Sequence, residues 1–435
     1  MSAAPAAVTA VFYDALETRD PAERERQVMA MLPGQVAHAQ ADAPAWTDLL
    51  HGVDAARIDS RAALAGLPVL RKHELVERQQ AACHGGDMAD TRQIFGGFST
   101  IGWGAQRGVR RVFASPGPIY EPEGHAVDYW RLARALHAAG FRAGDLVHNA
   151  FSYHFSPAGS IMETGAHALG CAVFPAGTGQ TEQQVRAMAD LRPAGYIGTP
   201  SFLKIVLEKA AELGVALPGL KRALVSGEAC PSNLVDWFAA QGVAALQCYA
   251  TADLGLIAYE TLSREGLVID EGVIVEIVRP GTGQPLPDGE VGEVVVTTLN
   301  PDYPLIRFGT GDLSAVLPGM CPTGRTNARL RGWLGRADQT AKVRGLFVHP
   351  HQVAEVLRRH PEIRCARLVL SGETGQDRME LQAEIDGMPI EPKDLKERVV
   401  QSLRDVTRLR GNIVWVVPRT LPNDGRVIVD ERRHQ

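Results

Sequence analysis

Residues 113–124, FASPGPIYEPEG, have the outline of a phosphate-binding loop, because a serine, two glycines and turn-forming prolines follow the basic run RGVRR. The groups that would bind phosphate are missing from this outline. Its prolines have no backbone N–H, it has neither a threonine pair nor a Gly-Lys, and it carries an acid, Glu121, that would repel a triphosphate. We therefore expect a poor triphosphate binder. Arg110 and Arg111 are either alternative phosphate ligands or, in the favoured interpretation, solvated surface charges on a strand edge.

Three further loops of small and polar residues follow strand-like runs: GTP at 198–200, SGEACP at 226–231 and YATAD at 249–253. From about Ala126 to Ala250 strand-like runs alternate with helical runs of about 10–15 residues, which predicts a parallel α/β sheet. Ligands of such sheets bind just beyond the carboxyl ends of the strands. These three loops are therefore the first candidates for a binding site.

The rest of the chain predicts two further regions. Turn-separated strand-like segments predict a smaller β-rich subdomain over about 255–338. Mixed helix-like and strand-like runs then predict a small, mobile α+β domain. The expected organisation is an N-terminal domain, 1–338, and a C-terminal domain, 339–435. Near the N-terminus a helical pattern is expected to be interrupted at Pro33.

Composition excludes several classes of partner. The 435 residues carry a net charge of −5 and are 45% hydrophobic, so nothing attracts the chain to nucleic acid or to an acidic membrane surface. The N-terminal stretch lacks the basic region of a signal peptide, and no uninterrupted apolar run reaches about 18 residues, so we expect no membrane span. Six scattered cysteines without a CxxC pair predict reduced thiols and a cytoplasmic location.

The loops belong to a series of seven motifs that covers nearly the whole chain from about Glu25. The motifs are GTGQTEQQV at 177–185, TPSFL at 199–203, SGEACPS at 226–232, CYATADLG at 248–255, DGEVGEVVVTTL at 288–299, PLIRFGTGDLS at 304–314 and GRADQTAKVRGLFVHPHQV at 335–353. In this order and spacing they resemble the adenylate-forming enzymes of the acyl-CoA synthetase superfamily, in particular the phenylacetate–CoA ligase branch.

The resemblance implies a two-step reaction on a small aromatic acid. The carboxylate attacks the α-phosphate of ATP and releases pyrophosphate, which leaves an acyl-adenylate. The C-terminal domain then rotates, and the thiol of coenzyme A displaces AMP. Mg²⁺ and cationic groups offset the charge on the phosphates, and a water-poor site limits hydrolysis. The family also implies a homodimer.

Several positions match the nucleotide- and coenzyme-binding residues of the family. Asp312, in GTGDL, matches the acid that binds both ribose hydroxyls, since a carboxylate can accept both donors; a strand-capping turn aspartate is the alternative. For Tyr249 and Gly345 the alternatives are a core tyrosine and a turn glycine. The other matches are Arg336 for the ribose, Tyr249 and Ala250 beside adenine, Gly227, Glu228 and Ala229 around adenine and the acyl pocket, Gly345 where pantetheine passes, and Asp338 at the hinge.

Four departures lie on the ATP side, and three of them concern the candidate catalytic residues. The family's Tyr-Gly-x-Ser/Thr-Glu has become Tyr-Ala-Thr-Ala-Asp, so the α-phosphate hydroxyl is missing at Ala252. Thr251 is the candidate substitute, although in a strand its side chain would face the other side. Asp253 keeps the charge of the Mg²⁺-binding glutamate on a shorter arm. Arg426 replaces the catalytic lysine, and its planar fork is not a point charge. The fourth departure is the phosphate-type loop.

Some relatives carry a structural zinc held by Cys and His and a Cys-Pro-Cys-Gly turn. Here the turn is MCPTGRT, with Cys321 and Thr323, and the partner stretch YETLSREGLVID has neither Cys nor His. One ligand cannot hold a tetrahedral zinc, so we predict no structural zinc. For the HPH at 349–351, ordinary exposed histidines are the alternative to a metal pair.

The acyl pocket implied by the family is lined by Tyr153, His154 and Phe155 and by Phe202. This lining is aromatic and mildly polar, which suits a flat aromatic or short apolar acid. Tyr153 and His154 could form hydrogen bonds with a ring substituent. The alternative is that Phe155 and Phe202 belong to the core.

Three functions remain open at this point. The first is an acid–thiol ligase for an aromatic acid with altered adenylation. The second keeps the fold but condenses an acyl donor with an amine or hydroxyl, with or without ATP. The third is an inactive homologue that binds AMP, coenzyme A or an acyl ligand. Loss of the phosphate loop favours the last two, whereas retention of Asp312, Arg336 and Gly345 favours a working nucleotide or coenzyme A site.

Overall fold

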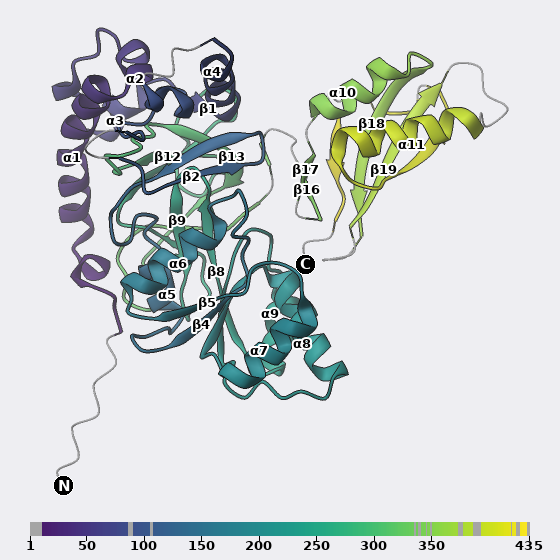
Figure 1. Cartoon of the computed structure of the whole chain (residues 1–435). Coiled ribbons are helices and arrows are strands. Elements are labelled where there is room, and N and C mark those ends of the chain that lie inside the picture. The colour runs from purple at the N-terminus through teal and green to yellow at the C-terminus, as the bar shows by residue number, and fades with distance from the viewer. Residues whose placement is uncertain are drawn as a thin grey trace. The chain divides into compact units, whose positions relative to one another are not determined.

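The structure, a computed structural model, divides into two compact units, Met1–Gly335 and Arg336–Gln435. Figure 1 shows both as ribbons coloured along the chain. The residues that the structure describes are 11–85, 90–104, 108–334, 336–337, 341–344, 346–348, 350–372, 377–385, 393–418, 420–422 and 427–432.

The first unit contains a nine-stranded sheet of order β14-β15-β10-β9-β8-β7-β6-β4-β5. On one side of β8, the strands β8, β7, β6, β4 and β5 pair in parallel. On the other side, β8, β9, β10, β15 and β14 pair antiparallel. The carboxyl ends of the parallel strands therefore share one edge. The strands are β4 (Leu146–Asn149), β5 (Ala172–Pro175), β6 (Gly195–Gly198), β7 (Arg222–Val225), β8 (Ala244–Thr251), β9 (Gly255–Glu260), β10 (Leu267–Ile269), β14 (Val316–Leu317) and β15 (Arg329–Leu330).

Helices cover both faces of the parallel strands. Successive residues of β6 point to opposite faces, and they join different cores. Ile197 packs with residues of α5 and α6, and Tyr196 packs with residues of α7, α8 and α9. Strands buried on both faces are apolar throughout, which explains the short apolar runs of the sequence. The helices are α5 (Ala133–Ala138), α6 (Ala158–Ala168), α7 (Thr181–Leu191), α8 (Pro200–Glu212) and α9 (Ser232–Ala240).

A second sheet has the order β1-β13-β12-β11, with β1 parallel to β13. The β-rich stretch expected over 255–338 therefore divides between two sheets, because β9, β10, β14 and β15 extend the nine-stranded sheet. Residues 111–123 form a separate hairpin, β2–β3. The strands are β1 (Leu70–Arg71), β2 (Arg111–Ser115), β3 (Ile119–Glu123), β11 (Val273–Val278), β12 (Gly292–Thr298) and β13 (Phe308–Ser314).

The N-terminal helix α1 (Pro21–Asp42) runs through Pro33, so the predicted interruption is wrong. A proline inside a helix costs about 3 kcal/mol. Leu32 and Val36 are both fully buried, and burying each contributes about 1.5–3 kcal/mol, which offsets that cost. The other elements of this region are α2 (Pro44–Leu49), α3 (Arg61–Ala65), α4 (Lys72–Gly85) and the 3-10 turns η1 (Ala15–Thr18), η2 (Ala55–Arg57) and η3 (Thr91–Phe95).

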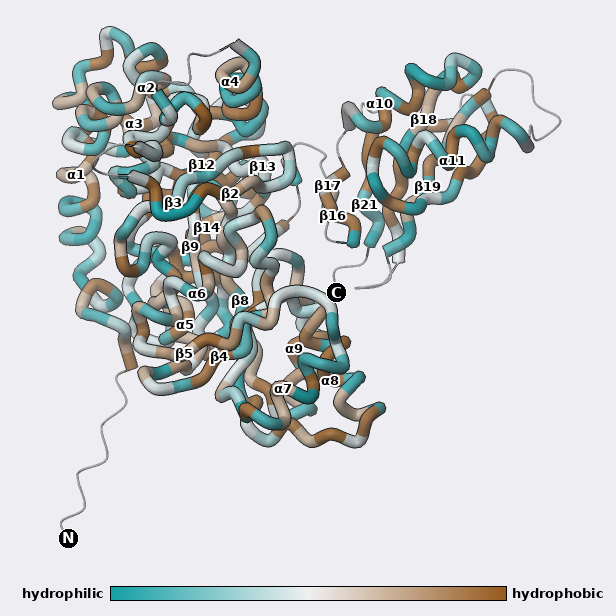
Figure 2. The backbone as a smooth tube through the Cα atoms, in the orientation of Figure 1, coloured by the Kyte–Doolittle hydropathy of each residue, from teal (hydrophilic) through white to brown (hydrophobic). Residues whose placement is uncertain are grey.

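The second unit is a small α+β fold built on a sheet of order β20-β19-β18-β21. Val356 of α10 and Val399 of α11 are buried in one core with Leu368 and Leu381 of the central strands. Figure 2 shows hydrophobic and hydrophilic residues alternating along both helices, as an amphipathic helix requires. The elements are β16 (Ala341–Val343), β17 (Leu346–Val348), α10 (Pro350–Arg359), β18 (Ile363–Ser371), β19 (Arg378–Ile385), α11 (Lys393–Thr407), β20 (Asn412–Val416) and β21 (Ile428–Asp430).

The two units together confirm the predicted class, a large α/β unit with a parallel sheet and a small α+β unit. In the part of the chain that the structure describes, no helix is long and apolar enough to cross a membrane. All six cysteines are free thiols.

Candidate functional site

The phosphate-type loop is the tight end of the β2–β3 hairpin, and its backbone donors are used within the protein. The N–H of Ser115 donates to the Glu121 carboxylate at 3.2 Å, and the N–H of Tyr120 donates to the side chain of Gln79 at 2.7 Å. Prolines at two of the three turn positions, 116–118, have no N–H. Few backbone donors are therefore left for a phosphate.

Glu121 points into the protein. Its side chain is fully buried and accepts hydrogen bonds from both the N–H and the hydroxyl of Ser115. Burial raises the pKa of Glu121 well above its usual range, and the charge of Asp253 raises it further, while Ser115 and Lys72 lower it. A raised pKa favours the neutral form of the carboxyl group, which repels an anion less than the carboxylate does. The repulsion of a triphosphate expected from the sequence therefore finds no support in this geometry.

Asp253 forms an ion pair with Lys72, whose Nζ lies 3.1 Å from Oδ2. The side chain of Asp253 is 2% exposed and that of Lys72 is 41% exposed, so the ammonium group reaches solvent while the carboxylate does not. Oδ1 of Asp253 has no hydrogen-bond partner among the described residues. A buried carboxylate oxygen without a partner suits a hard divalent cation. Asp253 therefore fits the role of a Mg²⁺ ligand.

No sequence motif points to Lys72, which lies 181 residues before Asp253. It reaches the site because Leu70 and Arg71 form β1, which pairs with β13, and the chain then enters α4 at Lys72. Two hydrogen bonds between Gln79 of α4 and the backbone of Tyr120 hold this helix against the hairpin. A two-residue strand leaves no local pattern, so this pairing could not be found from the sequence.

Asp312, in β13, has both carboxylate oxygens engaged. The Tyr249 hydroxyl donates to Oδ2 at 2.8 Å, and the indole N–H of Trp333 donates to Oδ1 at 3.1 Å. A carboxylate oxygen in general can accept more than one donor. The structure thus brings together Tyr249 and Asp312 from two separate motifs, and it adds Trp333, which no motif indicated.

The loop after β7 is held by its own contacts. Glu228 accepts the N–H of Ser201, in the first turn of α8, at 2.7 Å. Gly227 has φ +84°, a conformation that side chains disfavour. Gly227 is exposed and Ala229 is half-buried, so this loop presents backbone and small side chains at the carboxyl edge of the sheet.

The turn between β8 and β9 contains the substituted phosphate motif. The Thr251 hydroxyl accepts the N–H of Leu254 at 3.2 Å, which fixes it within the turn. Ala250 is half-buried and has no hydroxyl. Thr251 therefore serves the local turn geometry, but an accepting hydroxyl can still donate its own O–H, so its role as a substitute for the hydroxyl missing at Ala252 stays a prediction.

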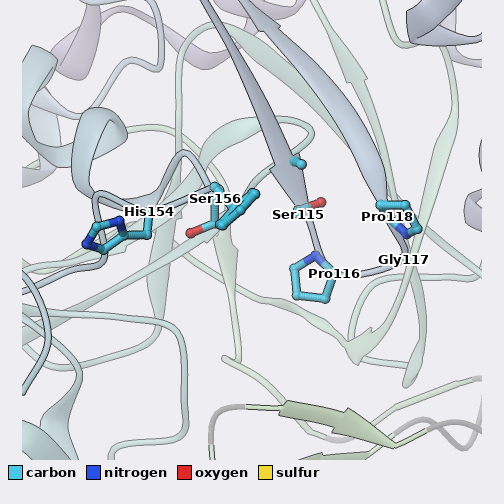
Figure 3. Close-up of a pocket in the computed structure, with 8 residues that line it drawn as sticks. Ser115, Pro116, Gly117, Pro118, His154 and Ser156 are labelled. Atoms are coloured by element: carbon cyan, nitrogen blue, oxygen red, sulfur yellow. The ribbon is translucent and has the colours of Figure 1, made fainter.

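A pocket of about 350 Å³ opens between the hairpin turn and the loop after β4 (Figure 3). Its walls are residues 114–118 and 154–156. The N–H of Ala114 donates to the Phe155 carbonyl at 2.8 Å, and Phe155 is 80% exposed with φ +59°. The alternative that Phe155 belongs to the core is therefore wrong. Phe155 and His154 both border this opening.

Tyr153 and Phe202 lie outside the described lining of this pocket. The Tyr153 hydroxyl accepts a hydrogen bond from Asn149 at 2.8 Å, and burial, followed by Glu163, raises the pKa of Tyr153. Phe202 is half-buried against the core beneath α7, α8 and α9. The four residues expected to line the acyl pocket are therefore not all in one place.

Some expected positions belong to the second unit or fall outside the described residues. Arg336 is described and half-buried. Asp338, Gly345, His349 and Arg426 lie outside the described residues, so their expected roles stay predictions.

Cys321 lies where relatives are expected to bind zinc, and it is surrounded by hydroxyl groups. Its Sγ lies 3.1 Å from the hydroxyl of Thr323, 3.4 Å from that of Thr261 and 3.7 Å from that of Ser263. Burial raises the pKa of Cys321, but these hydrogen bonds outweigh it and lower the pKa overall. One thiol and three neutral hydroxyls are not a zinc ligand set.

Comparison with known proteins adds independent findings. A model of the AMP-binding enzyme family matches residues 129–300. The phenylacetate–coenzyme A ligase of Thermus thermophilus is 33% identical over 328 residues, which are 70% of this chain and 73% of that protein. The corresponding ligase of Aromatoleum evansii is 34% identical over 270 residues, 59% of this chain and 61% of that protein. The chain thus matches less than two thirds of the Aromatoleum protein.

Solved structures share the fold. A 2-hydroxyisobutyryl-CoA ligase in complex with 2-HIB-AMP and CoA superposes with a TM-score of 0.81 at 24% identity, over 98% of this chain and 94% of that one. The amide bond synthetase McbA from Marinactinospora thermotolerans gives a TM-score of 0.52 at 19% identity, over 72% of this chain and 65% of that one. At these identities the likeness establishes the architecture.

Proposed function

The chain belongs to the phenylacetate–CoA ligase family of adenylate-forming enzymes, and on that premise we propose that it activates an aromatic carboxylic acid with ATP and transfers the acyl group to coenzyme A. The observation that carries the proposal is Asp312, a carboxylate oriented by hydrogen bonds from Tyr249 and Trp333, because a carboxylate is the group that can accept both hydroxyls of a ribose. Curated relatives over 30% identical are named as phenylacetate–coenzyme A ligases, which supports this substrate class.

Asp253 and Lys72 would serve the phosphate end in this proposal. Bound Mg²⁺ supplies charge neutralisation for the departing pyrophosphate, and Asp253 would hold it through the unpartnered Oδ1. Lys72 would then turn from Asp253 to the phosphates, since its side chain is 41% exposed and its ammonium is a mobile point charge. A lysine at a helix N-terminus opposes the helix dipole, so helix stability does not account for its position.

The acid would enter through the pocket between the hairpin and residues 154–156. Phe155 and His154 offer an exposed ring and a polar group there, which suits a flat aromatic acid. Carboxylate attack on the α-phosphate needs positioning more than covalent assistance from the protein. The hairpin turn forms the other wall of this pocket.

The second step is assigned to the C-terminal unit by family resemblance. We propose that this unit acts as a mobile lid over 339–435, that Arg336 contacts the ribose, and that Gly345 leaves room for pantetheine. Arg426 would take the place of the catalytic lysine. A homodimer and a cytoplasmic location are further proposals, the second supported by six free cysteines.

A second candidate reaction is supported by the hairpin. Because the hairpin uses its own N–H donors, the chain could join an acyl donor to an amine or hydroxyl without ATP. An inactive nucleotide-binding homologue would share the same weakness at the phosphate end.

ATP–pyrophosphate exchange with a panel of aryl acids separates these candidates. The ligase proposal predicts exchange that depends on the acid and on Mg²⁺. No exchange with any acid, in a protein that still binds AMP, would contradict the ligase and favour one of the other two.

A further inference from the structure

The side chain of Trp333 combines a buried contact with an exposed ring. Its indole N–H donates to Oδ1 of Asp312 at 3.1 Å, and Asp312 is 8% exposed. Trp333 itself is 39% exposed. Single exposed aromatic residues are common on protein surfaces. This one, however, directs its polar group to the carboxylate at the centre of the proposed nucleotide site.

The backbone around Trp333 is fastened to the end of β13, which fixes where the indole points. Gly332 has φ +109°, and glycine is the residue that adopts such a conformation without strain. Ser314 and the residues on either side of it hold both sides of this turn. The bonds are Arg331 N–H to Ala315 O (2.9 Å), Ser314 hydroxyl to Gly332 O (2.7 Å) and Leu334 N–H to Leu313 O (2.9 Å).

Two donors from different segments define the plane of the Asp312 carboxylate. Tyr249 binds Oδ2 and Trp333 binds Oδ1, so rotation of the carboxylate would break one of these bonds. Hydrogen bonds to carbonyl-type oxygens prefer lone-pair directions near that plane. With the plane fixed, the two carboxylate oxygens face set directions, as recognition of a rigid diol requires.

We propose that Trp333 is a positioning residue for the nucleotide. Its N–H orients Asp312 toward the two ribose hydroxyls, and its exposed ring forms an apolar wall beside the bound adenosine. The inference rests on the proposed function, which puts the ribose at Asp312. The inference adds Trp333, a residue outside the family motifs, to the nucleotide site. It also implies that Gly332 sets the orientation of the Trp333 indole.

The test is AMP binding by the full-length protein, measured by calorimetry, with Trp333→Phe and the control Trp103→Phe. Trp103 is similarly exposed, at 42%, and its ring packs edge-on against Phe95. Trp333→Phe keeps an apolar ring but removes the N–H donor to a charged group, so AMP affinity should fall about tenfold. The control should bind as the parent does. In the exchange assay KM for ATP should rise about tenfold with kcat within about twofold, because positioning of the ribose acts equally before and during the reaction.

Gly332→Ala gives an independent check, because it strains the turn and moves an unaltered indole. It should also weaken AMP binding, and circular dichroism confirms that each variant is folded. Parent-like AMP affinity in either Trp333→Phe or Gly332→Ala would overturn the inference and leave the proposed function intact. Absence of AMP binding by the parent would contradict both.

Discussion

The polar groups at the two ends of the proposed nucleotide site differ in how they are hydrogen-bonded within the protein. At the ribose end, Tyr249 and Trp333 donate to Asp312 and fix the orientation of a carboxylate, a group that can accept several donors. At the phosphate end, the hairpin binds its own donors, and the carboxyl group of Glu121 is folded back onto Ser115. The first end presents an oriented carboxylate acceptor, whereas the second uses most of its backbone donors within the protein.

The difference shows that an ordered backbone at a site does not by itself provide hydrogen-bonding groups for a ligand. Both ends keep an ordered backbone, but only polar groups with remaining hydrogen-bonding capacity gain by binding a ligand. A hairpin whose donors are already used can border a pocket without gripping a phosphate. We therefore expect this protein to recognise adenosine strongly and to recognise the triphosphate through Lys72 and the metal rather than through the loop.

The largest expected effect is at the ribose end. Asp312→Ala removes the acceptor of both ribose hydroxyls. Hydrogen bonds to a charged group are worth about 1.5–3 kcal/mol each, so AMP affinity should fall at least tenfold. Calorimetry with AMP measures the loss, and Asp288→Ala, at an exposed turn position, is the matched control. Unchanged AMP affinity in Asp312→Ala would place the ribose elsewhere.

The next effect is at the phosphate end and should be selective. Lys72→Ala removes a cation that lies 3.1 Å from Asp253, so we expect ATP affinity to fall about tenfold while AMP affinity stays unchanged. The exposed Lys221 provides a control through Lys221→Ala. Equal losses for ATP and AMP would show that Lys72 supports the fold of the site and not the phosphates.

The raised pKa of Glu121 predicts that the stability of the folded protein depends on pH. Its folded-state pKa is raised above the ordinary value of 4.5, so above that pH the folded protein binds more protons at this group than the unfolded chain does. Stability therefore falls as pH rises from 4.5 toward the folded pKa. Glu121→Gln keeps one carbonyl acceptor for Ser115 and does not titrate, and any loss of the second hydrogen bond is independent of pH. The difference in Tm, variant minus parent, should grow between pH 5 and pH 8, and a constant difference would contradict a neutral Glu121.

The smallest effect is expected from the arginines before the hairpin. Arg111 donates to the buried Glu123 at 3.0 Å and to Ser160 at 2.5 Å, so it is committed to the fold. Arg110 is exposed. Changing both to Ala should lower Tm through the Glu123 contact and leave the ratio of ATP to AMP affinity unchanged. A fall in that ratio would show that these arginines bind the phosphates.

The sequence predicted the elements whose patterns are local. The α8 helix begins where Thr199 caps it and Pro200 occupies its first position, and the alternation of strands and helices identified the parallel sheet. Pro33 was misjudged because burial of its neighbours outweighs a local penalty. Local rules describe the backbone well until tertiary packing opposes them.

The site was harder to predict because its contacts join distant segments. Lys72 reaches Asp253 across 181 residues through a two-residue strand. The inward direction of Glu121 depends on a bond to Ser115 across the hairpin. Trp333 depends on the left-handed backbone of Gly332. None of these features has a motif of its own, whereas Asp312 and Tyr249 lie in motifs that adjacent residues define.

The most direct test of this contrast is the pair of dissociation constants for ATP and AMP, measured for the parent protein with Mg²⁺ present. Both nucleotides share the ribose contacts, so their ratio isolates the phosphate end. We predict that ATP binds at most about tenfold more tightly than AMP. An ATP preference of a hundredfold or more, about 2.7 kcal/mol, would contradict the account and show that the hairpin grips the triphosphate after all.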